Sequence, residues 1–276
     1  MASTLWQSTE ADDDREPPEI DTSVAHIARV YDYWLGGKNH FAADREAGDA
    51  AVRAYPDMHM SVQQNRAFLQ RAVRYLANAG VRQFLDIGTG LPSSDNTHEV
   101  AQSIAPESRV IYVDNDPIVL AHARALLTSR PEGATGYLGA DARDTGTILA
   151  QAGKLLDFGQ PVAVMLIAVL HLIPDEDDPY QLVSDLMAAV PSGSYLVVSH
   201  VASDLQQQSP GATEAAATLS KLMFQRLTAR SQGQVLKLFS GLEILEPGIV
   251  PIQDWRPDGN PAAVRSAMRG GIGRKP

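Results

Sequence analysis

The stretch FLDIGTGLP, residues 84–92, decides the fold that this sequence predicts. An apolar run leads to Asp86, and Gly88 and Gly90 then precede a helix expected to begin near Asp95 or Asn96. In such a strand–turn–helix unit the glycines let the backbone approach a ligand, and the helix N-terminus supplies oriented N–H donors. Glycine also occurs in these turns for purely steric reasons, so this stretch alone leaves the ligand open.

Short apolar runs alternate with helical patterns from residue 80 onward. Strands are expected at residues 81–87, 109–113, 135–138, 162–168 and 195–199. This alternation predicts an α/β fold, in which helices cover both faces of a mostly parallel sheet. The stretch GLEILEPGIVPIQDW, residues 241–255, predicts an antiparallel hairpin that closes the sheet at one edge.

An all-helical section precedes the first strand. A first helix is expected from Ser23, as its N-cap, to Leu35, with Gly36 and Gly37 ending it. Further helices are expected over residues 42–53 and 61–79. Residues 1–22 are rich in acids and contain Pro17-Pro18, which predicts a disordered acidic tail.

Composition excludes several classes of function. The chain has 276 residues, a formal net charge of -10 and no cysteine, which excludes disulfides, thiolate metal sites and cysteine nucleophiles. Its acidity argues against a surface that coats nucleic acid. The longest apolar run, residues 162–170, is too short to cross a bilayer, and no basic-then-apolar leader pattern opens the sequence. We therefore expect a cytoplasmic protein with neither a nucleic-acid nor a membrane partner.

Acidic residues follow the next two expected strands. VIYVDND, residues 110–116, places Asp114 at a strand end, where a carboxylate can accept from both hydroxyls of a ribose. GAD, residues 139–141, places Asp141 where it could accept from an adenine amino group. Taken singly, Asp114 could cap a helix and Asp141 could belong to a turn. Their joint spacing favours a nucleoside site.

A nicotinamide-binding fold shares the glycine turn and the second-strand acid. Its fingerprint needs a third glycine near position 93, where this chain has Ser93, and an apolar residue where Asp86 stands. A carboxylate in that turn suits an ammonium group and would repel a pyrophosphate. An NAD(P)-dependent oxidoreductase is therefore the third hypothesis.

The glycine turn, Asp114 and Asp141 resemble the first three motifs of class I S-adenosylmethionine-dependent methyltransferases. ARVYDYWLGGKNHFAADR (28–45), NRAFLQRAVRYLANAGVRQFLDIGTGLP (65–92) and VIYVDNDPIVLAHARALL (110–127) are further similar to an actinobacterial S-adenosyl methyltransferase family, formerly a domain of unknown function. This resemblance implies a Rossmann-like sheet of seven strands with an antiparallel C-terminal hairpin. It also implies S-adenosylmethionine as the cofactor and residues 80–276 as the methyltransferase domain.

The class pattern implies which residues would meet the cofactor. Those residues are Asp86 and Gly88 at its amino-acid end, Gly90 and Asp114 at its ribose, and Asn115, Asp141 and Ala142 at its adenine. Asn65 and Arg66 could meet the cofactor carboxylate, with a surface salt bridge as the alternative for the arginine. Pro92 departs from the class, which often has a third alternate glycine there.

The stretch LIAVLHLIPDEDD, residues 166–178, follows the fourth strand, where the methyl group meets its acceptor in this class. Methyl transfer is an in-line displacement, so the enzyme positions the acceptor and, where needed, removes a proton. His171 is the candidate general base, although it could instead fill space between strand and helix. His200 could reach the same cleft. The acids at 175–178 predict an acidic first helical turn, and we expect no metal.

Residues 23–79 and an insertion at 201–235 would form a lid over the acceptor. Its candidate acceptor-binding residues make an apolar, hydrogen-bonding surface suited to a small molecule: Tyr31, Asp32, Trp34, Lys38, Asn39, Phe41 and Arg45. Core packing is the alternative for Tyr31 and Trp34. Gly36-Gly37-Lys38 does not match a phosphate loop, because it ends a helix and Asn39 follows the lysine.

The leading hypothesis is a methyltransferase that acts on an oxygen or nitrogen atom of a small molecule. No Asp/Asn-Pro-Pro-aromatic motif, which the class uses for amino groups of bases or amides, appears in the sequence. The alternative is a non-catalytic protein that binds or senses S-adenosylmethionine. The sequence determines neither the acceptor nor the oligomeric state.

Overall fold

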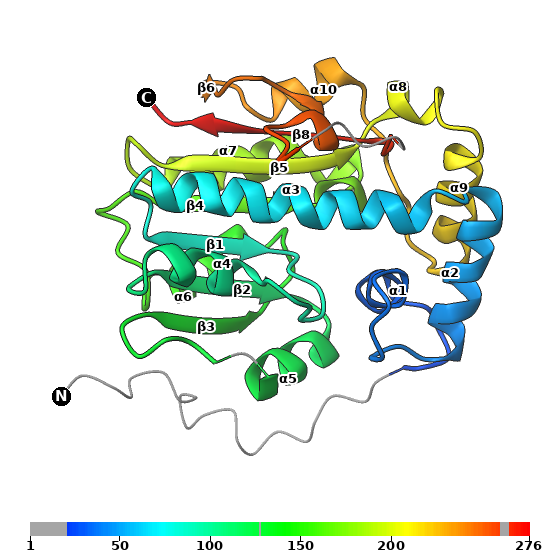
Figure 1. Cartoon of the computed structure of the whole chain (residues 1–276), viewed down its shortest axis with the longest axis horizontal. Helices are drawn as coiled ribbons and strands as arrows, with labels where there is room; N and C mark the ends of the chain where they lie inside the picture. Colours follow the sequence, from blue (N-terminus) through cyan, green and yellow to red (C-terminus); the bar gives the residue numbers. More distant parts are fainter. Residues whose placement is uncertain (1–20, 127, 260–264) are drawn as a thin grey trace.

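The computed structural model describes residues 21–126, 128–259 and 265–276 (Figure 1). The expected acidic tail therefore falls outside the described residues, apart from Asp21 and Thr22. A mixed eight-stranded sheet forms the centre, in the order β3-β2-β1-β4-β5-β8-β6, with β7 also paired to β8. Its parallel strands are β1 (Gln83–Ile87), β2 (Arg109–Asp114), β3 (Ala134–Gly139), β4 (Ala163–Ile167) and β5 (Tyr195–Val201).

Helices cover both faces of this sheet. One face packs against α6 (Thr145–Ala152), α7 (Pro179–Ala188) and α10 (Gln232–Lys237). The other packs against α3 (Met58–Asn78), α4 (Thr97–Ile104) and the 3₁₀ turn η3 (Ile252–Asp254). Side chains alternate along β1, with Phe84 in one core and Leu85 and Ile87 in the other, as a doubly covered parallel strand requires. The expected Rossmann-like α/β fold is confirmed.

The antiparallel edge differs from the expected hairpin. The strands of residues 241–255, β6 (Glu243–Ile244) and β7 (Val250–Pro251), do not pair with each other, and both pair with β8 (Met268–Arg274). β8 lies antiparallel beside β5. The sequence pattern of β8 does not predict a strand because it is glycine-rich. These glycines allow close packing, since a Cβ on Gly271 would lie 2.6 Å from the Ile249 side chain.

The first helix also begins later than expected. α1 spans Ile27–Trp34, and the His26 ring at the N-cap accepts a hydrogen bond from Ala28 N. Ser23 instead donates its backbone N–H and its hydroxyl to Asp21. Gly36, at φ +80°, follows the C-cap in the left-handed conformation that ends many helices.

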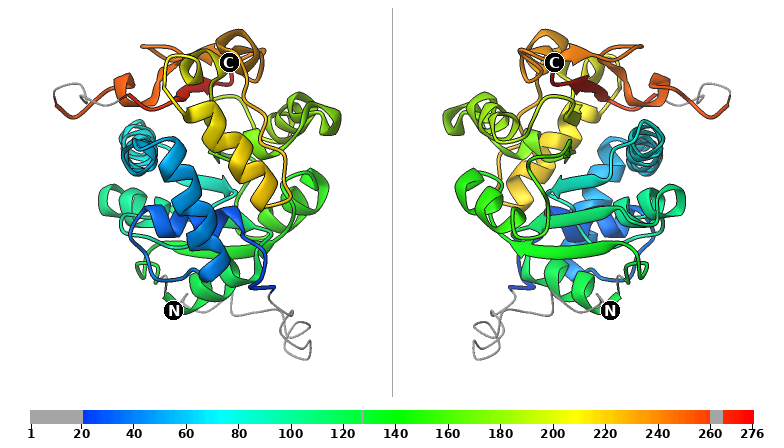
Figure 2. Two further views of the ribbon diagram at one scale, coloured as in Figure 1. Left: turned by 90° about the vertical axis from the view of Figure 1, so that its right-hand side faces the viewer. Right: turned by 90° about the vertical axis from the view of Figure 1, so that its left-hand side faces the viewer.

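Two segments distant in sequence share a small core at one end of the molecule. α1 and α2 (Ala42–Ala54) pack with α9 (Ala212–Leu222), and Figure 2 shows α2 and α9 running side by side. We call α1, α2 and α9 together the cap. The first turns of α3, with Met58 and Val62, also pack in this core, whereas the rest of α3 from Phe68 onward packs on the sheet.

The remaining short elements are α5 (Pro117–Leu126), α8 (Ser203–Gln206) and the 3₁₀ turns η1 (Leu170–Leu172) and η2 (Asp175–Asp177). Across the described ranges, no helix combines the length and apolar character needed to span a membrane.

Candidate active site

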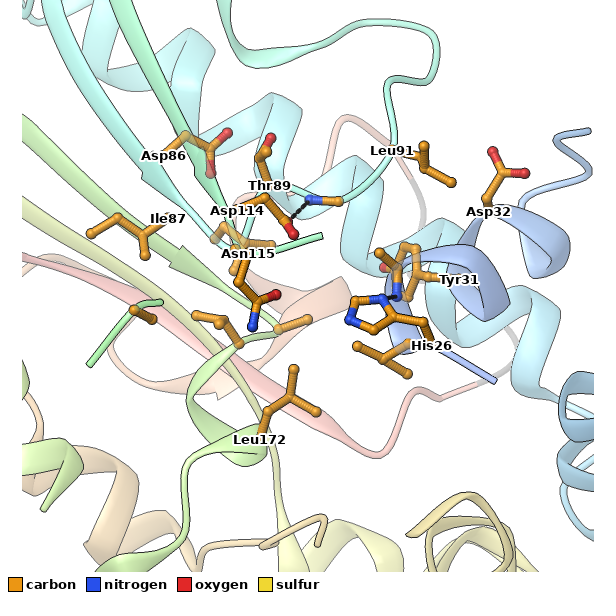
Figure 3. A pocket seen from close by; sticks show the side chains of 18 of the residues that line it. His26, Tyr31, Asp32, Asp86, Ile87, Thr89, Leu91, Asp114, Asn115 and Leu172 are labelled. Carbon is orange, nitrogen blue, oxygen red and sulfur yellow. Dashed lines mark hydrogen bonds between the residues drawn. The ribbon is translucent and has the colours of Figure 1, made fainter. Parts of the chain in front are cut away.

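A pocket opens at the carboxyl ends of the parallel strands, where the strand order reverses between β1 and β4 (Figure 3). The turns after β1, β2, β3 and β4 form its floor, α1 covers one side, and α3 contributes Asn65, Arg66 and Leu69. Ligands of open α/β sheets bind at this switch point. The topology therefore brings the predicted strand-end residues together.

The glycine turn is built for close approach. Gly88 and Gly90 have φ of +73° and +67°, which side-chain-bearing residues rarely adopt. A Cβ on Gly88 would lie only 2.5 Å from the Val169 side chain. Gly88 N also donates to Val113 O at 2.8 Å, which ties this turn to β2. The backbone at this point of the pocket therefore carries no side chain, and its hydrogen bond to β2 fixes its position.

Asp114 lies at the end of β2, with its carboxylate in the pocket (Figure 3). Its two oxygens accept from Gly90 N at 2.8 Å and from Asp116 N at 2.9 Å. Burial raises the pKa of this carboxyl, and the two backbone donors oppose that rise. Each oxygen keeps a second acceptor site, which suits the two hydroxyls of a ribose.

Asp86 lies deeper in the pocket and is only 2% exposed. One oxygen accepts from Thr97 Oγ1 at 2.6 Å, at the first turn of α4. Burial raises its pKa from 3.8 to about 6. A buried carboxylate without a cationic partner costs free energy, so this position favours a positively charged ligand group.

Asn65 and Arg66 offer open hydrogen-bonding atoms beside the pocket. Asn65 Nδ2 donates to the Tyr31 hydroxyl at 2.9 Å, while its Oδ1 is buried and has no partner among the described residues. Arg66 donates from Nη2 to Ser94 O and Asp95 O, and its Nε is buried without a partner there. An open acceptor beside an open donor suits a zwitterionic amino-acid group.

Arg143, which sequence reasoning missed, occupies the carboxylate of Asp141. It donates to both Asp141 oxygens and, from Nη1, to Asp177 at 2.9 Å. The guanidinium thereby lowers the pKa of Asp141. Asp141 lines the pocket with this ion pair in place, and its contact with an adenine amino group stays a prediction. Asn115 and Ala142 line the pocket as the class pattern implied.

The candidate acceptor residues of the N-terminal segment divide into two groups. Tyr31 and Asp32 line the pocket, although the Asp32 carboxylate accepts from Asn39 N at 2.8 Å and so is turned toward that loop (Figure 3). Trp34 is buried in the cap, where its ring N–H donates to Gly48 O. Outside the residues that line the pocket lie Lys38, Asn39, Phe41 and Arg45.

His26 is a second pocket residue that the sequence did not reveal. Its Nδ1 lies 3.0 Å from Asp116 Oδ2, at the start of α5. A small apolar cluster of Ala28, Leu91, Ile118 and Val119 lies at the same contact. α1 is thus docked onto the glycine turn and α5. The sequence pattern places the N-cap of this helix at Ser23. Placing it at His26, where the structure has it, is the one sequence signal that could have drawn attention to this residue.

His171 is not placed as a general base. It is buried in η1, edge-on to the His200 ring, whereas its neighbours Val169, Leu172 and Ile173 line the pocket. Burial, with His200 and Arg230 nearby, lowers the pKa of His171 to about 3. His200 has a pKa lowered to about 4, and its ring lies 2.7 Å from Val201 O and 2.8 Å from Arg230 Nη1. Both rings act here as buried packing and hydrogen-bonding groups.

The acids at 175–178 are used within the protein. Their partners are Arg230 for Asp175, Arg226 for Glu176, Arg143 for Asp177 and the backbone N–H of Gln181 for Asp178. Arg230 is itself fully buried and also donates to Leu170 O and Ile173 O. This arginine therefore fixes the loop that follows β4.

The S-adenosyl methyltransferase family matches residues 13–276. The chain belongs to this family. No curated protein matches it.

Solved structures of similar proteins agree with this family assignment. A DUF574 family protein from Streptomyces avermitilis is 45% identical with a TM-score of 0.90, over 94% of this chain and 100% of that one. A protein from Thermobifida fusca assigned as a methyltransferase is 39% identical with a TM-score of 0.85, over 94% and 98%. A methyltransferase from Anabaena variabilis, 15% identical with a TM-score of 0.51 over 95% and 98%, shares the fold.

The protein is therefore an S-adenosylmethionine-dependent methyltransferase, as the sequence resemblance implied. The pocket fits this cofactor, since the buried Asp86 suits its ammonium group and the open atoms of Asn65 and Arg66 suit its amino-acid end. Asp114 adds acceptors for a ribose. The nicotinamide hypothesis is set aside, because a carboxylate at Asp86 would oppose a pyrophosphate.

Proposed function

We propose that this methyltransferase acts on an oxygen or nitrogen atom of a small molecule. The observation that carries the proposal is the covered pocket. The strand-end residues lie on one side of it, α1 lies on the other, and apolar side chains form part of its wall. Leu35, Leu172 and Ile173 contribute to that wall. A site of this kind takes up a small ligand and excludes water, whereas a macromolecular acceptor would need a more open surface.

In this proposal the chain holds the cofactor by the atoms described above. Asp86, Asn65 and Arg66 bind its amino-acid end, Gly88 and Gly90 allow close contact, and Asp114 binds its ribose. Asn115 and Ala142 border the adenine. When bound, S-adenosylmethionine supplies an electrophilic methyl group on a positively charged sulfur. The carboxylates of Asp86 and Asp114 favour that positive charge.

The remaining pocket residues favour positioning over proton removal. The Tyr31 hydroxyl donates to Val62 O and accepts from Asn65, and burial raises its pKa, so it stays protonated and does not act as a base. His26 is the imidazole that lines the pocket, and its Nδ1 lies 3.0 Å from Asp116 Oδ2. Catalysis would rest mainly on orientation and exclusion of water under the cap, which acts as the lid.

Two measurements test the proposal. Calorimetry should show S-adenosylmethionine binding that Asp114→Ala weakens by at least about a hundredfold, because the two ribose hydroxyls each donate to a charged acceptor and such bonds contribute about 1.5–3 kcal/mol each. Asp185→Ala, an exposed acid on α7, is the matched control and should bind normally. Incubating the protein with methyl-labelled cofactor and a Streptomyces avermitilis extract should then place label in dialysable molecules other than the cofactor itself. Label confined to protein or nucleic acid would refute the proposed acceptor class.

A further inference from the structure

The turn after α9 has an unusual residue at its key position. Gln225 N donates to Ser220 O at 3.2 Å, which closes the helix end around Met223 and Phe224. Phe224 stands in the left-handed conformation, at φ +50°, where this type of helix end normally has glycine. An aromatic side chain there strains the backbone, and such strain is concentrated at functional sites.

Phe224 is also the most exposed of the large apolar side chains among the described residues. It is 85% exposed, compared with 49% for Leu236, which is the next. The fold gains nothing from an aromatic ring in solvent on a strained backbone, since glycine would relieve the strain and remove the exposed ring. The position therefore calls for a role outside the fold.

The same turn directs the next residue into the pocket. Gln225 lines the pocket together with Leu172 and Ile173 of the loop after β4. Among the residues lining this pocket, it is the one that comes from the C-terminal side of β5. Its side chain can offer both a donor and an acceptor, whereas Leu172 and Ile173 beside it are apolar.

The segment that carries this turn is firmly attached to the β4 loop. Leu227 N donates to Ser220 Oγ at 3.0 Å, and Thr228 N donates to His171 O at 2.8 Å. The segment then ends at the fully buried Arg230, which binds the carbonyls of that same loop. We call this turn the rim: it is held against the β4 loop, with Gln225 in the pocket lining and Phe224 next to it in the chain at the surface.

The charges near this rim are already paired. Arg226 donates to Glu176, and Arg143, which lines the pocket, is shared between Asp141 and Asp177. An anionic acceptor would have to break one of these ion pairs and would also face the pocket carboxylates. An acceptor without negative charge meets neither cost.

We propose that Phe224 and Gln225 are specificity-determining residues that hold the methyl acceptor, and that this acceptor carries no negative charge and has an apolar ring or chain. The inference rests on the proposed small-molecule function. Gln225 hydrogen-bonds a polar group of the acceptor inside the pocket, and the Phe224 ring packs against its apolar part at the rim.

The test uses methyl-labelled cofactor and serial dilutions of one dialysable Streptomyces avermitilis fraction, which give an apparent KM and kcat. Gln225→Leu should raise the apparent KM about five- to tenfold, as loss of one hydrogen bond predicts, with kcat within about twofold. Phe224→Gly should raise the apparent KM while increasing the melting temperature, because it relieves the strained turn. Cofactor affinity should stay unchanged in both. Gln207→Leu, an exposed glutamine outside the pocket lining, is the control.

The labelled product should pass through an anion exchanger at pH 8. If the wild-type protein labels a dialysable product but both variants keep its apparent KM, or if that product is an anion, this inference is overturned and the proposed function stands. If the wild-type protein labels no dialysable product, the proposed function fails and the inference fails with it.

Discussion

Replacing Asp86 with asparagine should make the protein more stable and its cofactor binding weaker. Asp86 is 2% exposed, and burial raises its pKa from 3.8 to about 6. Below pH 3.8 the carboxyl is protonated in both the folded and the unfolded chain. As the pH rises from 3.8 through the folded pKa of about 6, the unfolded chain releases its proton more readily than the folded chain does. The free energy of unfolding therefore falls over this interval. The pKa difference corresponds to about 3 kcal/mol at full ionisation.

Asparagine has the same shape and still accepts from Thr97 Oγ1, which donates to Asp86 at 2.6 Å. The free energy of unfolding of Asp86→Asn, relative to the wild type, should therefore increase with pH. Of the about 3 kcal/mol, roughly half should appear between pH 5 and pH 8. The Thr97 hydroxyl lowers the pKa of Asp86, so Thr97→Val should raise that pKa further. The loss of stability with rising pH should then extend to higher pH.

Urea unfolding at pH 5, 6.5 and 8 without cofactor, followed by tryptophan fluorescence, measures these differences. Calorimetry at pH 8 should show the opposite ranking, with S-adenosylmethionine bound at least tenfold more weakly by Asp86→Asn, because a charge-assisted contact to its ammonium is lost. A stability difference that is the same at pH 5 and pH 8 would show that the buried charge of Asp86 carries no such cost, and the reasoning would be refuted.

Three further outcomes follow from the site. Gly88→Ala should lower the free energy of unfolding by about 2–4 kcal/mol in urea, because a Cβ would meet Val169 at a φ of +73°. Arg230→Leu should cost about 3–5 kcal/mol in the same assay, whereas Arg226→Leu, from an exposed ion pair, should change stability by less than about 1 kcal/mol. His171→Asn should leave the pH profile of kcat between pH 5 and 9 unchanged, because a group with a pKa of about 3 does not titrate there.

The sheet and the cofactor end of the pocket could be predicted because they depend on local patterns. Gly88, Gly90 and Asp114 directly follow apolar strands, and a parallel sheet brings such strand ends to one edge. β8 could not be predicted, because glycine has low strand propensity and the strand depends on packing against β5 and on close contacts such as that of Gly271 with Ile249.

The rest of the pocket depends on tertiary contacts that no local pattern encodes. His26 faces the pocket because α1 docks on α5, and Arg143 is shared with Asp177 because η2 lies near the turn after β3. Gln225 reaches the pocket through an unexpected left-handed turn at Phe224. A candidate base drawn from chain position alone was therefore assigned to His171, which the fold turns toward His200.

The shared core of the cap has a consequence for how this family can diversify. A helix from the first fifth of the chain packs on a helix from the last third, and Gly211 approaches Ala54 O so closely that no side chain fits between them. Substitutions in α9 that adapt the pocket to another acceptor must be accompanied by compensating substitutions in α2. The sheet and the turns that bind the cofactor need not change. Natural relatives with different acceptors should therefore show paired variation between residues 42–54 and 211–223 on a constant nucleoside-binding half.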